Sequence, residues 1–136
     1  MSTRRAFLKT VAATAVGVAT AAVPGMAGAV QAQQCYPSNV IYTADDPGKW
    51  EAKVGTHAPQ VEVQGMAVSI LTSHPMSGEH FIVRHTLVSE GGEVIGAVTF
   101  TPDDMPLSEH TVPGPGTYYA TSFCNQHDFW VTKFTV

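Results

Sequence analysis

Basic residues are scarce in this 136-residue sequence, and the scarcity limits what the protein can bind. Lysine and arginine number 7 against 11 aspartates and glutamates, for a formal charge of −4. Three of the basic residues fall in the first nine positions, within a segment that reads as a removable leader. Without it, four basic and eleven acidic residues remain, a formal charge of −7. Phosphate contacts require clustered Lys and Arg. The composition therefore excludes a nucleic-acid-binding protein, and an anionic substrate would need a local positive charge.

The sequence also lacks a hydrophobic run long enough to span a membrane. The uncharged apolar run of residues 11–23 is shorter than the roughly 20 residues that a spanning helix needs. It follows the Arg4-Arg5 pair and precedes small-residue cleavage patterns that end at Ala29 and Ala32. These features predict a cleaved signal peptide over residues 1–32. The arginine pair resembles a twin-arginine signal, which predicts a periplasmic or otherwise exported protein whose mature form has no membrane span.

Cysteine is nearly absent, which excludes a scaffold held together by several disulfides. The two cysteines, Cys35 and Cys124, allow one disulfide in an oxidising compartment. Cys35 lies close to the predicted cleavage site, in a tail, and Cys124 belongs to a motif with a different use. We therefore expect Cys35 to be free or paired between molecules.

Sustained helical periodicity is missing as well, and the mature chain instead shows strand patterns. Short apolar or alternating segments are separated by Gly, Pro and Asp turns every eight to twelve residues, which is typical of an antiparallel β-sandwich. We predict one all-β domain over residues 33–136, of about seven strands, with an irregular N-terminal arm to about residue 55. The arm is expected to hold one short strand at 40–43. The other predicted strands are 61–63, 66–71, 81–88, 94–101, 107–112, 117–123 and 129–136.

What the sequence does contain is a Cys-x2-His pair, Cys124 and His127, between the last two predicted strands. The spacing places a thiolate and an imidazole within reach of one metal ion in a tight loop. A rigid sheet is a good support for such a site. Taken alone the spacing is weak evidence, so the remaining histidines decide its meaning.

Three further histidines lie in predicted loops or at strand ends, where function is usually carried. These are His57, His74 and His80. Together with the Cys-x2-His pair they provide enough nitrogen donors to complete a metal site. His85 lies within a predicted strand and reads as a packing or surface residue, and His110 precedes a Pro/Gly turn without a partner signal.

Two motifs carry a family resemblance. His74-Pro75-Met76-x3-His80-Phe81-Ile82 and Cys124-Asn125-x-His127-x2-Trp130 resemble the paired motifs of the superoxide reductase family, which includes neelaredoxin and the catalytic domain of desulfoferrodoxin. The segment 96–102 is similar to the one between those motifs. The resemblance covers residues 56–136 and implies an immunoglobulin-like sandwich with one non-haem iron. The implied ligands are equatorial His57, His74, His80 and His127, and axial Cys124.

The resemblance implies one-electron reduction of superoxide to hydrogen peroxide, with an external electron donor restoring ferrous iron. It also implies that backbone N–H groups near Asn125 and Gln126 bond to the sulfur. The chain departs from the family at Gly55 and Thr56, where members usually carry Glu-Lys. That departure puts enzymatic activity in question, and Lys53 is the nearest candidate for steering superoxide. No four-cysteine rubredoxin-like module is present. A homo-oligomer is compatible with the sequence.

A copper protein is the alternative. Residues 115–119 leading to Cys124 and His127 also resemble the ligand loop of a cupredoxin, an electron carrier whose copper is held by two histidines, a cysteine and a weak axial methionine. No methionine follows His127, and the His74 motif would then lack a purpose. A reductase-like scaffold that binds copper, for electron transfer or storage, is a mixed case. A structural or adhesive sandwich with accidental histidines is the third interpretation.

Overall fold

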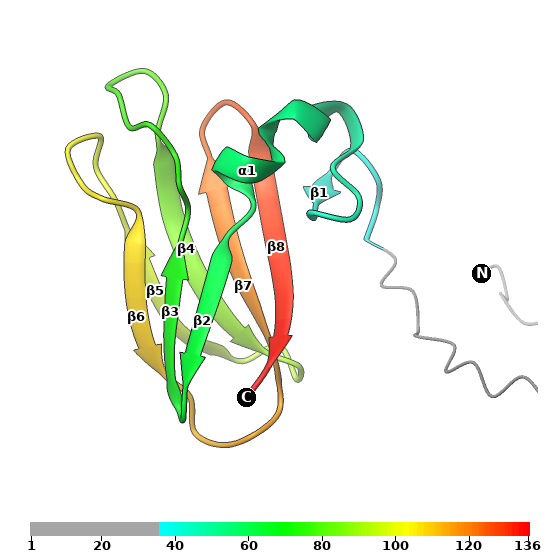
Figure 1. Ribbon diagram of the computed structural model, residues 1–136, viewed down its shortest axis with the longest axis vertical. Helices are drawn as coiled ribbons and strands as arrows, with labels where there is room; N and C mark the ends of the chain where they lie inside the picture. The colour runs from blue at the N-terminus through cyan, green and yellow to red at the C-terminus, as the bar shows by residue number, and fades with distance from the viewer. Residues whose placement is uncertain (1–35) are drawn as a thin grey trace, which may run out of the picture. The chain divides into compact units, whose positions relative to one another are not determined.

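The computed structural model describes residues 36–136, whose strands form two facing β-sheets (Figure 1). The predicted signal peptide and Cys35 lie outside the described residues. Within the described part of the chain, no helix is long and apolar enough to cross a membrane. The strands are β1 (Ile41–Tyr42), β2 (Gln60–Gln64), β3 (Ala67–Leu71), β4 (Ile82–Ser89), β5 (Val94–Thr99), β6 (Leu107–Thr111), β7 (Thr117–Cys124) and β8 (Asp128–Thr135).

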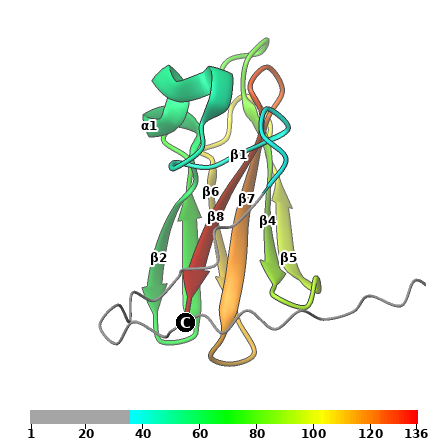
Figure 2. The ribbon, with the colours of Figure 1, turned by 90° about the vertical axis from the view of Figure 1, so that its right-hand side faces the viewer.

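The predicted all-β sandwich is confirmed. One sheet has the order β1-β8-β7-β4-β5 and the other the order β2-β3-β6. The turned view shows the two layers edge-on (Figure 2). The neighbours in each sheet are antiparallel except β1, a two-residue strand that pairs in parallel with β8. Every strand predicted from the sequence, including the short one in the arm, has its counterpart among the described residues.

The core lies between the sheets, where alternate residues of each strand point inward. Its larger apolar cluster occupies the end of the sandwich away from the helical segment and is built of buried residues from both sheets. Its members are Val68, Ile70, Leu87, Val112, Tyr118 and Ala120. A smaller cluster of Ile82, Phe100 and Cys124 lies toward the other end, with Met76 and Val98 packed against it.

The N-terminal arm differs from the irregular segment that the sequence predicted. A 3-10 helix (Gly48–Lys53) runs directly into one turn of α-helix, α1 (Val54–His57). Ten residues are too few for an apolar periodicity to stand out in the sequence. The helix ends at His57, because Ala58 takes the extended backbone conformation that the following Pro59 favours.

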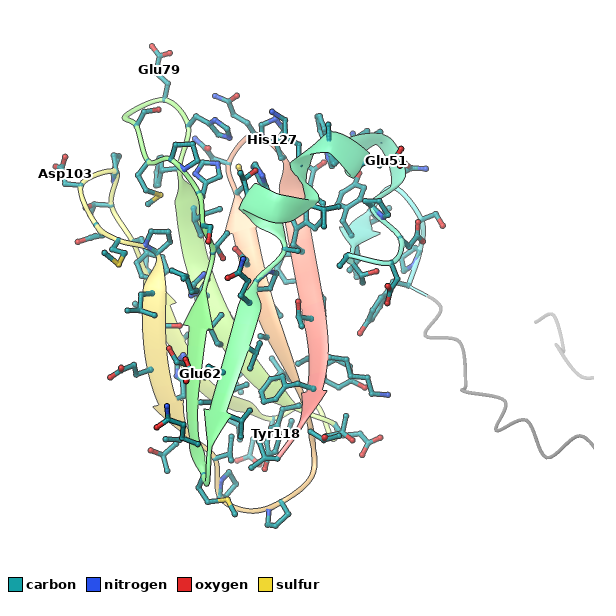
Figure 3. The ribbon with its side chains drawn as sticks, viewed as in Figure 1. Glu51, Glu62, Glu79, Asp103, Tyr118 and His127 are labelled. Atoms are coloured by element: carbon teal, nitrogen blue, oxygen red, sulfur yellow. The ribbon has the colours of Figure 1, made fainter. Side chains whose placement is uncertain are left out.

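The helical segment and two loops meet at one end of the sandwich. α1, the loop between β3 and β4, and the turn between β7 and β8 all lie at this end (Figure 1). His127 is at this end and Tyr118 toward the opposite one (Figure 3). Segments far apart in the sequence thus place their side chains together here.

Candidate metal centre

Five side chains converge at this end of the sandwich. Each offers one ligand atom, and these atoms all lie within 4.8 Å of one another. They come from α1, the β3–β4 loop, the last residue of β7 and the β7–β8 turn. The five are His57, His74, His80, Cys124 and His127. All the ligands expected from the sequence are therefore brought together, and none lies elsewhere.

The imidazole nitrogens are spaced as donors around one ion. His57 Nε2 lies 3.0 Å from His127 Nδ1, which lies 2.9 Å from His80 Nε2, and that atom lies 3.1 Å from His74 Nε2. A square with edges of about 3 Å has its corners about 2.1 Å from its centre, the length of a metal–imidazole bond. His80 Nε2 and His127 Nδ1 each face two other ring nitrogens, and one proton cannot satisfy both contacts. The donor set therefore fits a bound cation.

Cys124 Sγ completes the group as a fifth donor. It lies 3.6 Å from His127 Nδ1 and 3.9 Å from His74 Nε2. Burial raises the pKa of the Cys124 thiol, while backbone N–H groups of Gln126 and His127 and the charge of Lys53 act to lower it. A metal ion would deprotonate this thiol outright. Five donors also exceed the four that a closed structural zinc site takes.

The amide groups that face the sulfur differ by one residue from the expected pair. Gln126 and His127 supply them. The Asn125 amide instead donates to Phe81 O at 3.2 Å. Asn125 thereby joins the cysteine turn to the start of β4, next to His80, and its side chain strengthens the link by accepting a hydrogen bond from Phe81 N at 3.0 Å.

His57 is held in the orientation that a ligand needs. Its Nδ1 lies 2.8 Å from Thr56 Oγ1 and 3.2 Å from Lys53 O, so it can donate its proton to the carbonyl. That arrangement leaves the Nε2 lone pair directed at the other nitrogens. Burial, followed by the neighbouring histidines, lowers the pKa of His57 to about 4, and burial lowers the pKa of His74 to about 4 as well. Both imidazoles are neutral at pH 7, the form that binds metal.

Asp128 ties the helical segment to the cysteine turn. The three-residue turn 125–127 ends at Asp128, whose φ of +66° is a left-handed conformation that Asp tolerates better than most residues. Its carboxylate accepts a hydrogen bond from Trp50 Nε1 at 3.2 Å and pairs with Lys49 Nζ at 3.6 Å. The Trp50 indole in turn contacts the His127 ring edge-on, with centroids 4.6 Å apart. No pattern in the sequence indicates these contacts.

Trp130 supports the same turn from inside the core. It is fully buried, and its Nε1 donates to His127 O at 2.9 Å. Its ring centroid lies 6.0 Å from that of His57. The tryptophan of the second motif therefore has a structural explanation, since it fixes the backbone of one candidate ligand and packs against another.

The charge of Lys53 reaches the cluster. Lys53 lies four residues before His57, one helical turn away and on the same face. Its positive charge contributes to lowering the pKa values of His74, Cys124 and His127. The described group contains no carboxylate. Glu79, at the tip of the β3–β4 loop, points away from His127 (Figure 3).

A surface depression of about 430 Å³ lies elsewhere, on the three-stranded sheet. Its lining includes Glu62, Ser69 and Glu109, which are neighbours across β2, β3 and β6. None of the five converging residues lines it. This depression is therefore separate from the five possible metal ligands, which lie at the end of the sandwich that carries α1 and the β7–β8 turn.

Known proteins share both the fold and the sequence pattern. The chain matches the desulfoferrodoxin family over residues 49–133. It is similar to the superoxide reductase (neelaredoxin) from Ignicoccus hospitalis at 28% identity and a TM-score of 0.59, covering 71% of this chain and 93% of that one. A superoxide reductase solved in the oxidized state has 26% identity and a TM-score of 0.52, covering 71% and 96%.

The 1Fe superoxide reductase from Giardia intestinalis, at 19% identity and a TM-score of 0.55 over 60% of this chain and 98% of that one, supports the fold alone. No curated protein matches the chain. The family match covers residues 49–57 of the helical segment, the β3–β4 loop and the cysteine turn, and so includes all five converging residues. The chain belongs to the desulfoferrodoxin family.

Proposed function

We propose that this protein is a one-iron superoxide reductase. A single iron ion is held by the four histidines and Cys124, and superoxide takes up one electron and two protons to give hydrogen peroxide. An external donor of unknown identity returns the electron. The observation that carries the proposal is the convergence of four imidazole nitrogens and one sulfur within 4.8 Å in a chain of this family.

Bound iron would supply the one-electron couple that this reduction requires. Burial lowers the pKa of His57 and of His74 and so keeps both imidazoles neutral, and Lys53 O sets the His57 tautomer. The amides of Gln126 and His127 direct their dipoles at the sulfur and so moderate its donation to the metal. Trp50 shields one side of the His127 ring from solvent.

Lys53 is proposed to attract superoxide. The described domain is acidic, so an anion approaching it is repelled unless a local cation offsets the field. Lys53 is half-buried, and its charge acts on three of the five donors. Gly55 and Thr56, which occupy the places of the family's Glu-Lys pair, carry no charge. Lys53 is therefore the residue through which this chain retains steering.

Catalytic turnover tests the proposed function. The iron-loaded protein, supplied with a chemical reductant and a steady source of superoxide, should form one hydrogen peroxide per superoxide consumed and release no dioxygen. A yield near one half, with dioxygen released, would identify a dismutase. Superoxide that decays at its uncatalysed rate would overturn the proposal.

Copper is the competing metal, because the Irving–Williams order favours copper over ferrous iron at a site of nitrogen and sulfur donors. The geometry argues against a blue-copper centre, since four imidazoles converge where such a site uses two. Met76, which packs near Cys124, has its Sδ engaged by Ile82 N at 3.3 Å. Elemental analysis and a visible spectrum of protein purified after native export decide between the metals.

Export through the twin-arginine pathway is also proposed, supported by the Arg4-Arg5 pair and the apolar run that follows it. Arg4→Lys together with Arg5→Lys should leave the full-length precursor inside the cell. Processing that continues unchanged in this double variant would contradict the proposed route.

A further inference from the structure

A layer of polar side chains crosses the core directly beneath the candidate metal centre. Along β7 the inward-facing residues run Ala120, Ser122, Cys124, and Ser122 is fully buried. Along β3 and the residues that follow it, the run is Ile70, Thr72, His74, and Thr72 is fully buried. In each run the polar residue lies between the larger apolar cluster and a candidate ligand.

The layer is joined by a continuous chain of hydrogen bonds. Ser122 Oγ lies 2.9 Å from Thr72 Oγ1, which lies 2.8 Å from His85 Nε2. His85 Nδ1 lies 2.9 Å from Ser108 Oγ, which lies 3.1 Å from His110 Nε2. With His85 neutral, every hydroxyl can donate in one direction and accept from the other.

These side chains connect the two sheets. Ser122 and His85 lie on β7 and β4 of one sheet, whereas Ser108 lies on β6 of the other and Thr72 directly follows β3. His85 is fully buried between them and contacts the Phe100 ring at 4.8 Å between centroids. An apolar layer of the same shape would fill this space at little cost, whereas a satisfied polar network specifies one arrangement of the strands.

That arrangement bears on two candidate ligands. Thr72 Oγ1 and Ser122 Oγ bond to each other, and each residue is two positions before a ligand on its own segment. Thr72 is further coupled to His74 because the His74 amide donates to Thr72 O at 2.7 Å. Thr72 and Ser122 therefore link the segment that carries His74 to the strand that carries Cys124.

We propose that Thr72, through its bonds to Ser122 and His85, is a positioning residue of the metal centre. It sets the distance between two candidate ligand atoms, Cys124 Sγ and His74 Nε2. The proposal rests on the ligand assignment given above but not on superoxide being the substrate. Its readouts are spectroscopic and need no turnover. A protein that binds metal without reducing superoxide would leave it standing.

The test compares three variants of the full chain loaded with iron. Thr72→Val keeps the shape of the side chain and removes the hydroxyl, whereas Thr72→Ser keeps the hydroxyl. Ile70→Val, two residues earlier, in β3 and in the apolar cluster, is the matched control for a small loss of packing. The charge-transfer band of the oxidised protein and the iron affinity of the reduced protein are measured for each.

Thr72→Val is expected to shift the charge-transfer band and to weaken iron binding by about 10- to 100-fold, the usual effect of losing a group that orients ligands. Thr72→Ser and Ile70→Val should keep the wild-type band. A wild-type band and affinity in Thr72→Val would overturn the proposal, as would an equal shift in Ile70→Val. A wild-type protein that takes up no metal would overturn the proposed function as well, so the two failures are distinguishable.

Discussion

At the scale of single residues, the donors of the metal centre are the ones that sequence patterns reveal. His74, His80, Cys124 and His127 lie in short motifs with fixed spacing, because ligands on one loop must reach one ion. No comparable motif indicates a role for Trp50 or Asp128. Their contact joins residues 78 positions apart, and no local pattern records a pairing of that kind.

Cys124 is the residue on which a thiolate spectrum depends. Cys124→Ser should abolish the charge-transfer band of the oxidised iron protein, because serine supplies no thiolate. Cys35→Ser is the matched control and should leave the band intact. Visible absorption of both variants checks this, and a band that survives in Cys124→Ser would contradict thiolate ligation by iron or by copper.

The number of histidine ligands separates the iron and copper hypotheses. His57→Ala and His74→Ala should each weaken metal binding by at least about 100-fold, since losing a ligand costs more than losing a group that orients one. A blue-copper site needs only one histidine upstream of the cysteine. Metal titrations that find wild-type affinity in either variant would show that the five-ligand assignment is wrong.

At the scale of elements, the strands were predictable and the helical segment was not. Apolar segments and turn signals predicted all eight strands, and every predicted boundary lies within two residues of the observed one. The sequence did not predict an irregularity in β4. A register shift between Ile82 and Arg84 changes which residues of this strand face inward. Ile82 and His85 are consequently both buried, so of the two alternatives predicted for His85, packing or surface, the structure shows packing.

Lys53, in the helical segment, is the residue whose removal tests electrostatic steering of superoxide. Lys53→Ala should lower the second-order rate with superoxide by roughly tenfold, the lower end of the range for electrostatic steering. Lys133→Ala, on the exposed face of β8, makes the same change in net charge and should have little effect. Pulse radiolysis at several salt concentrations measures both rates. Equal rates in the two variants would contradict a local role for Lys53.

Restoring the Glu-Lys pair of the family at positions 55 and 56 tests whether added charge in this segment raises the rate with superoxide. Gly55→Glu with Thr56→Lys should raise the rate at low salt, and the gain should shrink at 0.1 M salt, where screening acts over about 10 Å. A Cβ at Gly55 would meet nothing within 4 Å, so the new side chain has room. Thr56→Ser with Gly55→Ala is the uncharged control. An unchanged rate in the charged variant would show that steering has another source.

At the scale of the whole molecule, buried histidines link stability to pH. Burial, aided by the charge of His110, lowers the pKa of His85 from 6.5 to about 4. Because the unfolded chain binds this proton more readily, the contribution of His85 is complete above pH 6.5 and is lost as the pH falls toward 4. A shift of this size corresponds to about 3 kcal/mol.

Urea unfolding of the metal-free protein should therefore show stability that falls steadily from pH 6.5 to pH 4, with His57 and His74 adding to the slope. Histidine NMR signals of the folded protein provide a residue-specific check, since the His85 ring should not titrate until near pH 4. A His85 ring that titrates at 6.5 would contradict its neutral state in the hydrogen-bonded layer.

In the proposed function, the four histidines and Cys124 hold an iron ion that gives one electron to superoxide. A single-turnover experiment tests it most directly: the reduced, iron-loaded protein receives a pulse of superoxide while the thiolate charge-transfer band and the peroxide yield are recorded. The band should grow at a rate proportional to protein concentration, with one hydrogen peroxide formed per iron oxidised. A pulse that leaves the iron reduced, while superoxide disappears no faster than in buffer, would contradict it.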